Sequence, residues 1–195
     1  MTWYPDLGTE TMVTSGNHVR AIGWLSSGKP FPTGGVPHHF VERLRLFTER
    51  ACESGDALWF GAFGGWHACE LCRNHIGTAN LGVPSGEVLY VAPEMISHYV
   101  EEHDYAPPTD FVAAVMSCPL PGTPEYDELA APFNRLQKEG LERLRQERVD
   151  HLARLAVERG ATDEVIREIA SGYVGMLGDS VPEVCERIRR SLPKD

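Results

Sequence analysis

The sequence has few cysteines and no long apolar run, and both features limit the classes of protein to which the chain can belong. Only five of the 195 residues are Cys, and only Cys69 and Cys72 stand close together. An odd number of cysteines with only one close pair is a poor disulfide framework for a chain of this size. No run of about 18 apolar residues occurs, and residues 1–6 lack the basic and apolar segments of a signal peptide. These features predict a cytoplasmic protein.

The sequence also has few positively charged residues. The chain has 18 Lys and Arg against 28 Asp and Glu, which gives a net charge of −10. Such a charge repels the phosphate backbone of nucleic acids and anionic membrane surfaces. We therefore expect neither nucleic acid nor membrane as a partner, and we expect a protein or a small molecule instead. The chain is 42% hydrophobic and 24% charged, which is typical of an ordinary folded protein.

Complete nucleotide-binding and metalloprotease motifs are missing. Two glycine-containing segments, Gly61–Gly65 and Ser26–Pro30, superficially look like phosphate-binding loops. Neither has the full Walker spacing, and Pro30 stands where that motif requires Ser or Thr. The His-Glu-x2-His motif of zinc proteases and the signature of zinc deaminases are not found either. We interpret both glycine-containing segments as turns.

Charge and composition change near Pro124. Residues 1–124 hold 6 basic and 13 acidic residues and all four Trp, whereas residues 125–195 hold 12 basic and 15 acidic residues and no Trp. The segment 118–124 contains three prolines and a glycine, which disfavour a continuous helix or a central strand. We therefore predict two parts, a domain at 1–124 and an extension at 125–195.

Hydrophobic periodicity predicts mixed secondary structure in the first part. Alternating or short apolar runs predict strands at 19–25, 57–61 and 87–91. Apolar residues at helical spacing predict helices at 38–51, 93–103 and 109–116. These short strands and helices together predict a small α+β domain.

The second part is predicted to be helical. Leucines recur every three to five residues over 125–159, although Pro132 and Gly140 interrupt the pattern and are candidate kink positions. Gly160 is a natural helix stop and Thr162 a natural helix cap, and two further helices are predicted at 162–177 and 181–192. We expect this amphipathic extension to pack on the first domain or on a second copy of itself, forming a homodimer.

The chemistry-bearing pattern is a Cys-x2-Cys motif followed by two histidines. Cys69 and Cys72 can turn two thiolates toward one ion, and His98 and His103 can complete a tetrahedron. Zinc suits mixed thiolate and imidazole ligands because it is borderline soft and has no geometric preference of its own. The sequence therefore predicts a Cys2His2 zinc site within the α+β domain.

Five side chains compete for the four positions. We favour Cys69, Cys72, His98 and His103, with His67 as an alternative ligand or as a neighbour that orients the site. His98 and His103 are five residues apart, about 500° of rotation on a regular helix. Both can bind one ion only if the last helical turn loosens. The remaining histidines are interpreted as ordinary surface residues: His18, His38, His39, His75 and His151.

These motifs resemble a known family. The segments Gly65–Cys72 and Ala92–Pro108, with the earlier Tyr4–Leu7, Gly23–Leu25 and Pro30–Gly34, resemble an uncharacterised bacterial family of small cytoplasmic proteins. The resemblance covers residues 3–118 and leaves the helical extension outside it. It implies that the Cys and His residues in these segments are important as a group, and it implies no activity.

Three functions are compatible with the predicted site. A closed structural zinc site in a protein-interaction module is the favoured one, because four protein ligands leave no position for a substrate. The alternative is a zinc-dependent hydrolase with an open position for water, in which Glu70, Glu101, Glu102 or His67 serves as general base. The third is a thiol redox centre formed by Cys69 and Cys72.

Overall fold

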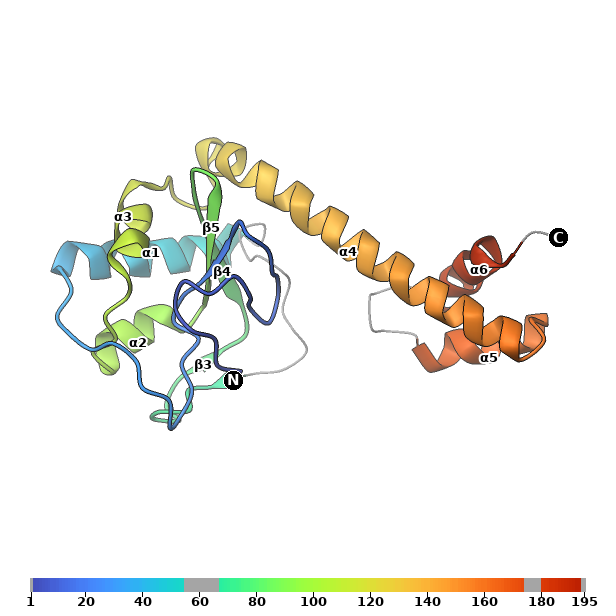
Figure 1. Ribbon diagram of the computed structural model, residues 1–195. Helices are drawn as coiled ribbons and strands as arrows, with labels where there is room; N and C mark the ends of the chain where they lie inside the picture. Colours follow the sequence, from blue (N-terminus) through green and yellow to red (C-terminus); the bar gives the residue numbers. More distant parts are fainter. Residues whose placement is uncertain (1, 55–66, 174–179, 194–195) are drawn as a thin grey trace. The chain divides into compact units, whose positions relative to one another are not determined.

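The computed structural model describes residues 2–54, 67–173 and 180–193. The chain divides into two compact units, Met1–Asn134 and Arg135–Asp195, which are considered separately below (Figure 1). The predicted strand at 57–61 and the residues 64–66 of the cysteine motif lie outside the described residues. The predicted domain boundary at residue 124 stays a prediction.

The first unit contains a three-stranded sheet in the order β1-β5-β4. The central strand β5 (Val88–Pro93) pairs in parallel with β1 (Val19–Ala21) and antiparallel with β4 (Asn80–Ser85). A two-residue turn connects β4 to β5, and its first residue, Gly86, has φ +59°. That backbone conformation favours glycine and is typical of tight hairpin turns.

A second, smaller sheet is a two-stranded hairpin. Its strands β2 (His67–Ala68) and β3 (Ile76–Gly77) have two residues each and pair antiparallel. A hairpin this short has little stability in water without further support. The segment between its strands carries Cys69 and Cys72.

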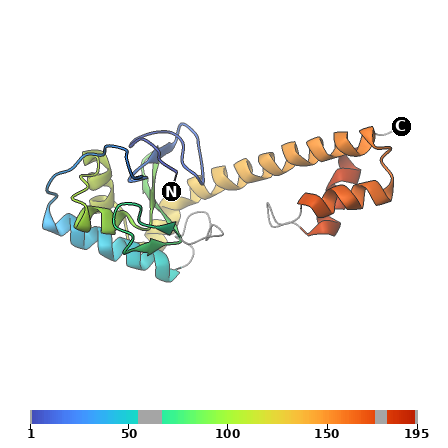
Figure 2. The ribbon, with the colours of Figure 1, turned by 90° about the horizontal axis from the view of Figure 1, so that it is seen from below.

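Three helices cover the sheet of the first unit. They are α1 (His38–Ser54), α2 (Ile96–Glu102) and α3 (Thr109–Ser117), and α1 runs beside both of the others (Figure 2). The structure starts α2 three residues later than predicted, because Pro93 ends β5 instead of opening the helix. Large side chains from every layer are fully buried in one core: Ile22, Trp24, Phe40, Phe47, Leu89, Tyr99 and Phe111.

The second unit is helical. It consists of the later part of α4 (Pro124–Glu158), together with α5 (Asp163–Tyr173) and α6 (Val181–Ser191). Gly160, with φ +90°, follows the end of α4, and the Thr162 hydroxyl accepts the N–H of Val165 at 3.3 Å, which confirms the predicted stop and cap. The three helices share a core of small and branched side chains: Leu152, Ala153, Ala156, Ile166, Ala170, Val184 and Ile188.

The observed class is therefore α+β with a helical C-terminal part, as predicted. Helix α4 continues through both Pro132 and Gly140. Within the described ranges, no helix has the length and apolar character needed to cross a membrane.

Candidate metal centre

The cysteine pair lies in a tight turn at the tip of the small hairpin. The N–H of Cys69 donates to the carbonyl of His75 at 2.8 Å, and the N–H of Arg73 donates to the carbonyl of Cys69 at 2.8 Å. Arg73 has φ +63°, so the chain reverses there. The N–H of Asn74 points at the Cys72 sulfur at 3.4 Å. This turn holds both sulfur atoms near one point and supplies a donor to one of them.

The two histidines come from the other side of the site, at α2 and its end. His98 lies in the helix, whereas His103 lies just beyond it, with φ −126° and ψ 12°. The N–H of His103 still donates to the Tyr99 carbonyl at 3.2 Å, and the next residue, Asp104, has φ +53°. The last turn keeps its hydrogen bond, and it is the end of the helix at Glu102 that frees His103 from the regular helical backbone conformation. Because the helix ends there, imidazoles five residues apart face the same point.

The four ligand atoms lie at distances that suit one metal ion. The Cys69 Sγ is 3.4 Å from the His103 Nε2, and the Cys72 Sγ is 3.4 Å from the His98 Nε2. The two Nε2 atoms are 3.2 Å apart, and all four ligand atoms lie within 4.8 Å of one another. A tetrahedron with metal–ligand bonds of 2.0–2.3 Å has edges of about 3.3–3.8 Å. The group can therefore hold a metal ion.

Burial and neighbouring charge favour the metal-binding form of one ligand, His98. Cys69 is fully buried, whereas Cys72, His98 and His103 are partly accessible. Burial lowers the pKa of His98, and the neighbouring His75 and His103 lower it further. A lowered pKa favours the neutral imidazole, which is the form that coordinates a metal.

Aromatic rings surround the histidine side of the cluster. The ring of His75 stacks on that of His98, with centroids 4.5 Å apart and planes 9° apart. The buried ring of Tyr99 lies 5.9 Å from the ring of His98 and 6.2 Å from that of His103. Sequence analysis missed the role of His75, and the only available signal was its position three residues after Cys72. These rings restrict how the two imidazoles can rotate.

Two of the candidate general bases are engaged in hydrogen bonds or ion pairs. The Glu70 Oε2 accepts the hydroxyl of Ser26 at 2.7 Å and the N–H of Ser27 at 3.0 Å. The Glu101 carboxylate forms an ion pair with Arg45 at 2.6 Å. Glu70 thereby ties the cysteine turn to the loop that follows residue 25.

His67, the alternative ligand, lies on β2 opposite Gly77. Its side chain is half-buried and lines a small pocket of about 20 Å³ together with Trp24, Asn80 and Met95. Among the described residues, the converging ligand atoms belong to Cys69, Cys72, His98 and His103, and His67 is not one of the group.

The fold and this cluster define a small α+β protein with a candidate Cys2His2 metal centre. Residues 2–116 match the family described as Domain of unknown function (DUF7919), and the chain belongs to that family. The match includes all four residues of the cluster and ends within α3, so α4, α5 and α6 lie outside it. No curated protein and no solved structure matches the chain.

Proposed function

We propose that this protein binds one zinc ion through Cys69, Cys72, His98 and His103, and that the metal is structural. The convergence of their four ligand atoms within 4.8 Å is the observation that carries the proposal. Two thiolates and two imidazoles match the ligand preference of zinc. Four protein ligands complete a tetrahedral shell and leave no position for a substrate or a reacting water.

The positions of the four ligands explain how a bound metal would stabilise the fold. The cysteines come from the hairpin β2–β3, whose strands are too short to be stable alone. The histidines come from α2 and its end, whose Ile96, Tyr99 and Val100 are buried in the core. A bound ion would tie the hairpin to the core, and its binding free energy would become folding free energy.

We further propose that the domain acts through binding, as a protein-interaction module. A closed metal site provides no reactive position, and the net charge of −10 favours a protein or small-molecule partner over nucleic acid. The metal would then maintain the shape of the surface around the hairpin rather than take part in a reaction.

Cobalt substitution tests the ligand set directly. We expect the metal-free protein to bind one equivalent of Co²⁺, with the visible absorption of a tetrahedral ion and a thiolate charge-transfer band in the near ultraviolet. Zinc should displace the cobalt. Single Cys72→Ser and His98→Ala substitutions should weaken binding or change the spectrum, whereas His67→Ala and the exposed control His39→Ala should leave both unchanged.

The spectrum also separates the proposal from its competitors. An octahedral spectrum without a thiolate band would contradict the ligand set. Loss of binding in the His67→Ala variant would assign the fourth position to His67. A tetrahedral spectrum that changes when azide is added would indicate an open position and would contradict a closed structural site.

A further inference from the structure

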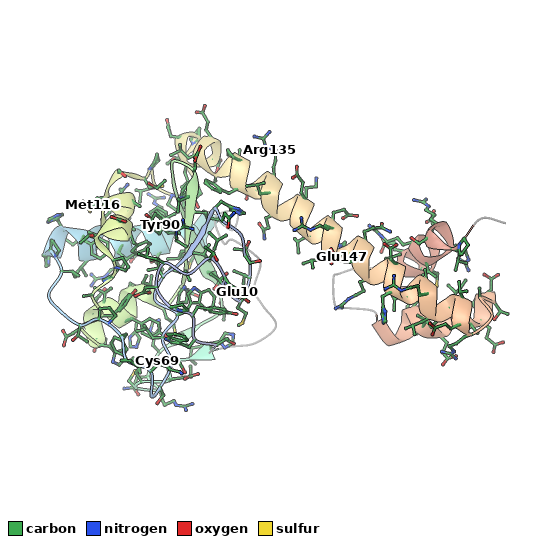
Figure 3. All side chains as sticks on the ribbon, viewed as in Figure 1. Glu10, Cys69, Tyr90, Met116, Arg135 and Glu147 are labelled. Atoms are coloured by element: carbon green, nitrogen blue, oxygen red, sulfur yellow. The ribbon has the colours of Figure 1, made fainter. Side chains whose placement is uncertain are left out.

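A small pocket in the first unit lies where the hairpin β2–β3 meets the main sheet. His67 of β2 pairs with Gly77 of β3, Asn80 of β4 pairs with Pro93 of β5, and all four residues line the pocket. His67 stands two residues before Cys69, which Figure 3 labels. The pocket therefore shares the hairpin with the metal centre, but its lining contains none of the four residues of the cluster.

Asn80 is the residue that points to a ligand. It is only 8% exposed, and its side-chain amide has no hydrogen-bond partner among the described residues. Neither amide atom is fully enclosed by protein, so the accessible part of this nearly buried residue is the part that faces the pocket. A buried amide without a partner is costly for a fold, whereas a ligand can supply the missing bonds.

His67 is a second polar side chain with unused hydrogen-bonding capacity. Its imidazole is half-buried, and in the part of the chain that the structure describes it forms no hydrogen bond, ion pair or ring contact. A neutral imidazole donates from one ring nitrogen and accepts at the other. Two polar side chains from different sheets therefore meet at one pocket without partners of their own.

The remaining walls are apolar and leave little space. Trp24, Pro93 and Met95 are buried where they line the pocket. The Nε1–H of Trp24 already donates to the Val91 carbonyl at 3.0 Å, so the indole offers only its ring. The pocket holds about 20 Å³, somewhat more than the roughly 10–15 Å³ that one water needs. Only a group of a few atoms can be enclosed there.

Charge makes a neutral ligand the best match. The described residues that line the pocket include no Lys or Arg, and their one charged group is Glu94. Its Oε2 accepts the N–H of Thr78 at 2.9 Å and the N–H of Ala79 at 3.1 Å. An anion would be repelled by this carboxylate, and a cation would compete with hydrogen bonds that already exist.

We propose that this pocket binds a primary carboxamide. The N–H of Asn80 donates to the carbonyl oxygen of the ligand, and the Asn80 carbonyl accepts from its NH2 group, because two amides complement each other edge to edge. His67 donates or accepts one further bond at the rim. The alkyl part of the ligand lies against Trp24 and Met95. A free small amide and a glutamine side chain of a partner both carry this group.

Nuclear magnetic resonance titration of the full chain with three probes tests the chemistry. Acetamide, acetone and acetate have the same size, but acetone and acetate lack the N–H donors. We expect acetamide to bind in the millimolar range, as suits so small a ligand, and to shift the signals of the Asn80 amide and the Trp24 indole. Acetone and acetate should bind about tenfold more weakly, because a hydrogen bond to the Asn80 carbonyl is lost.

Variants locate the binding site. Asn80→Leu should abolish acetamide binding without lowering the thermal unfolding temperature, because the amide has no partner in the fold to lose. His67→Ala should weaken binding several-fold and leave the metal content unchanged. Asn134→Leu, an exposed asparagine of α4, is the control and should bind as wild type does. Should Asn80→Leu fail to fold, unchanged binding by His67→Ala would contradict the proposal.

Three further results would overturn the proposal. Absence of any shift with acetamide would leave the pocket to water alone. Equal binding of acetate or acetone would contradict recognition of the amide, and wild-type binding by Asn80→Leu would place the site elsewhere.

The peptides Gly-Gln-Gly and Gly-Glu-Gly distinguish the two sources of the carboxamide. Tighter binding of Gly-Gln-Gly than of acetamide, with no binding of Gly-Glu-Gly, would support a glutamine side chain as the ligand. Binding of acetamide but of neither peptide would support a free small amide. Gly-Glu-Gly binding as tightly as Gly-Gln-Gly would contradict the proposal, since only the amide end differs.

Discussion

At the scale of single residues, Asp6 is a carboxylic acid held in a half-buried position. Its Oδ1 accepts the N–H of Gly23 and the hydroxyl of Tyr105, both at 2.9 Å. Burial raises the pKa of Asp6, although the two hydrogen bonds act in the opposite direction. Because the folded pKa lies above the unfolded one, stability from this group is greatest at low pH and is lost as pH rises through the folded pKa.

Replacing Asp6 with Asn should therefore remove a pH dependence. Asn keeps an acceptor for Gly23 and Tyr105 but does not titrate. We expect the free energy of unfolding of Asp6→Asn, relative to wild type, to rise as the pH increases above about 4, the ordinary pKa of Asp in an unfolded chain. Urea denaturation at several pH values measures this difference, with the exposed Glu128→Gln as control. A difference that is constant over this range would contradict the assignment.

Glu70 connects the cysteine turn to the adjacent loop without being a metal ligand. Removing its carboxylate in Glu70→Ala deletes the hydrogen bonds from Ser26 and Ser27. We expect a loss of about 1 kcal/mol in stability, discounted for the partial exposure of the group. Metal stoichiometry should stay at one. Glu102→Ala, which removes an exposed carboxylate on α2, should lose much less stability. Equal losses of stability in the two variants would contradict the role of Glu70 in holding the cysteine turn.

The four residues of the cluster were predictable from spacing because a Cys-x2-Cys turn and a helix end are local structures. The stacking of His75 on His98 was not predictable, because it depends on how the hairpin meets α2. Residue spacing within one segment contains no information about that contact.

At the scale of elements, strand β4 was not predicted from the pattern of apolar residues. Its sequence contains Gly82 and Pro84, which normally weaken a strand prediction. Among the described residues, the strand lies at the edge of the sheet order β1-β5-β4, with ladder pairing on one side of its backbone only, and a proline is tolerated there. Strands β2 and β3 were missed because two residues are too few to show alternation.

The hairpin strand β3 also contacts the core at one glycine. A Cβ added at Gly77 would lie 2.7 Å from the Cγ of Met95, a buried residue next to α2. We therefore expect Gly77→Ala to destabilise the protein by about 1–3 kcal/mol through overpacking. Thermal or urea unfolding measures the effect. Gly34→Ala, where the nearest atom is 3.8 Å away, is the matched control, and an equally small effect at Gly77 would contradict the close packing.

At the scale of the whole molecule, the sequence predicted an α+β part and a helical part. It predicted that the extension packs on the first domain or on a second copy, but not that the beginning of α4 does so through Tyr126, Ala130 and Phe133, which are buried in the first unit. The Tyr126 hydroxyl donates to the carbonyl of Gly82 at 2.7 Å. Helical spacing identifies an apolar face, but it does not identify which element covers that face.

The most direct test of a structural zinc site combines metal analysis with chelation. Protein purified without a metal-binding tag should contain one zinc per chain by mass spectrometry. Because all four Trp lie within residues 1–124, chelation should produce a cooperative change in tryptophan fluorescence while much helical circular dichroism remains. Added zinc should reverse it. Protein with no bound metal, or metal that leaves without any change in fluorescence or thermal stability, would contradict the account.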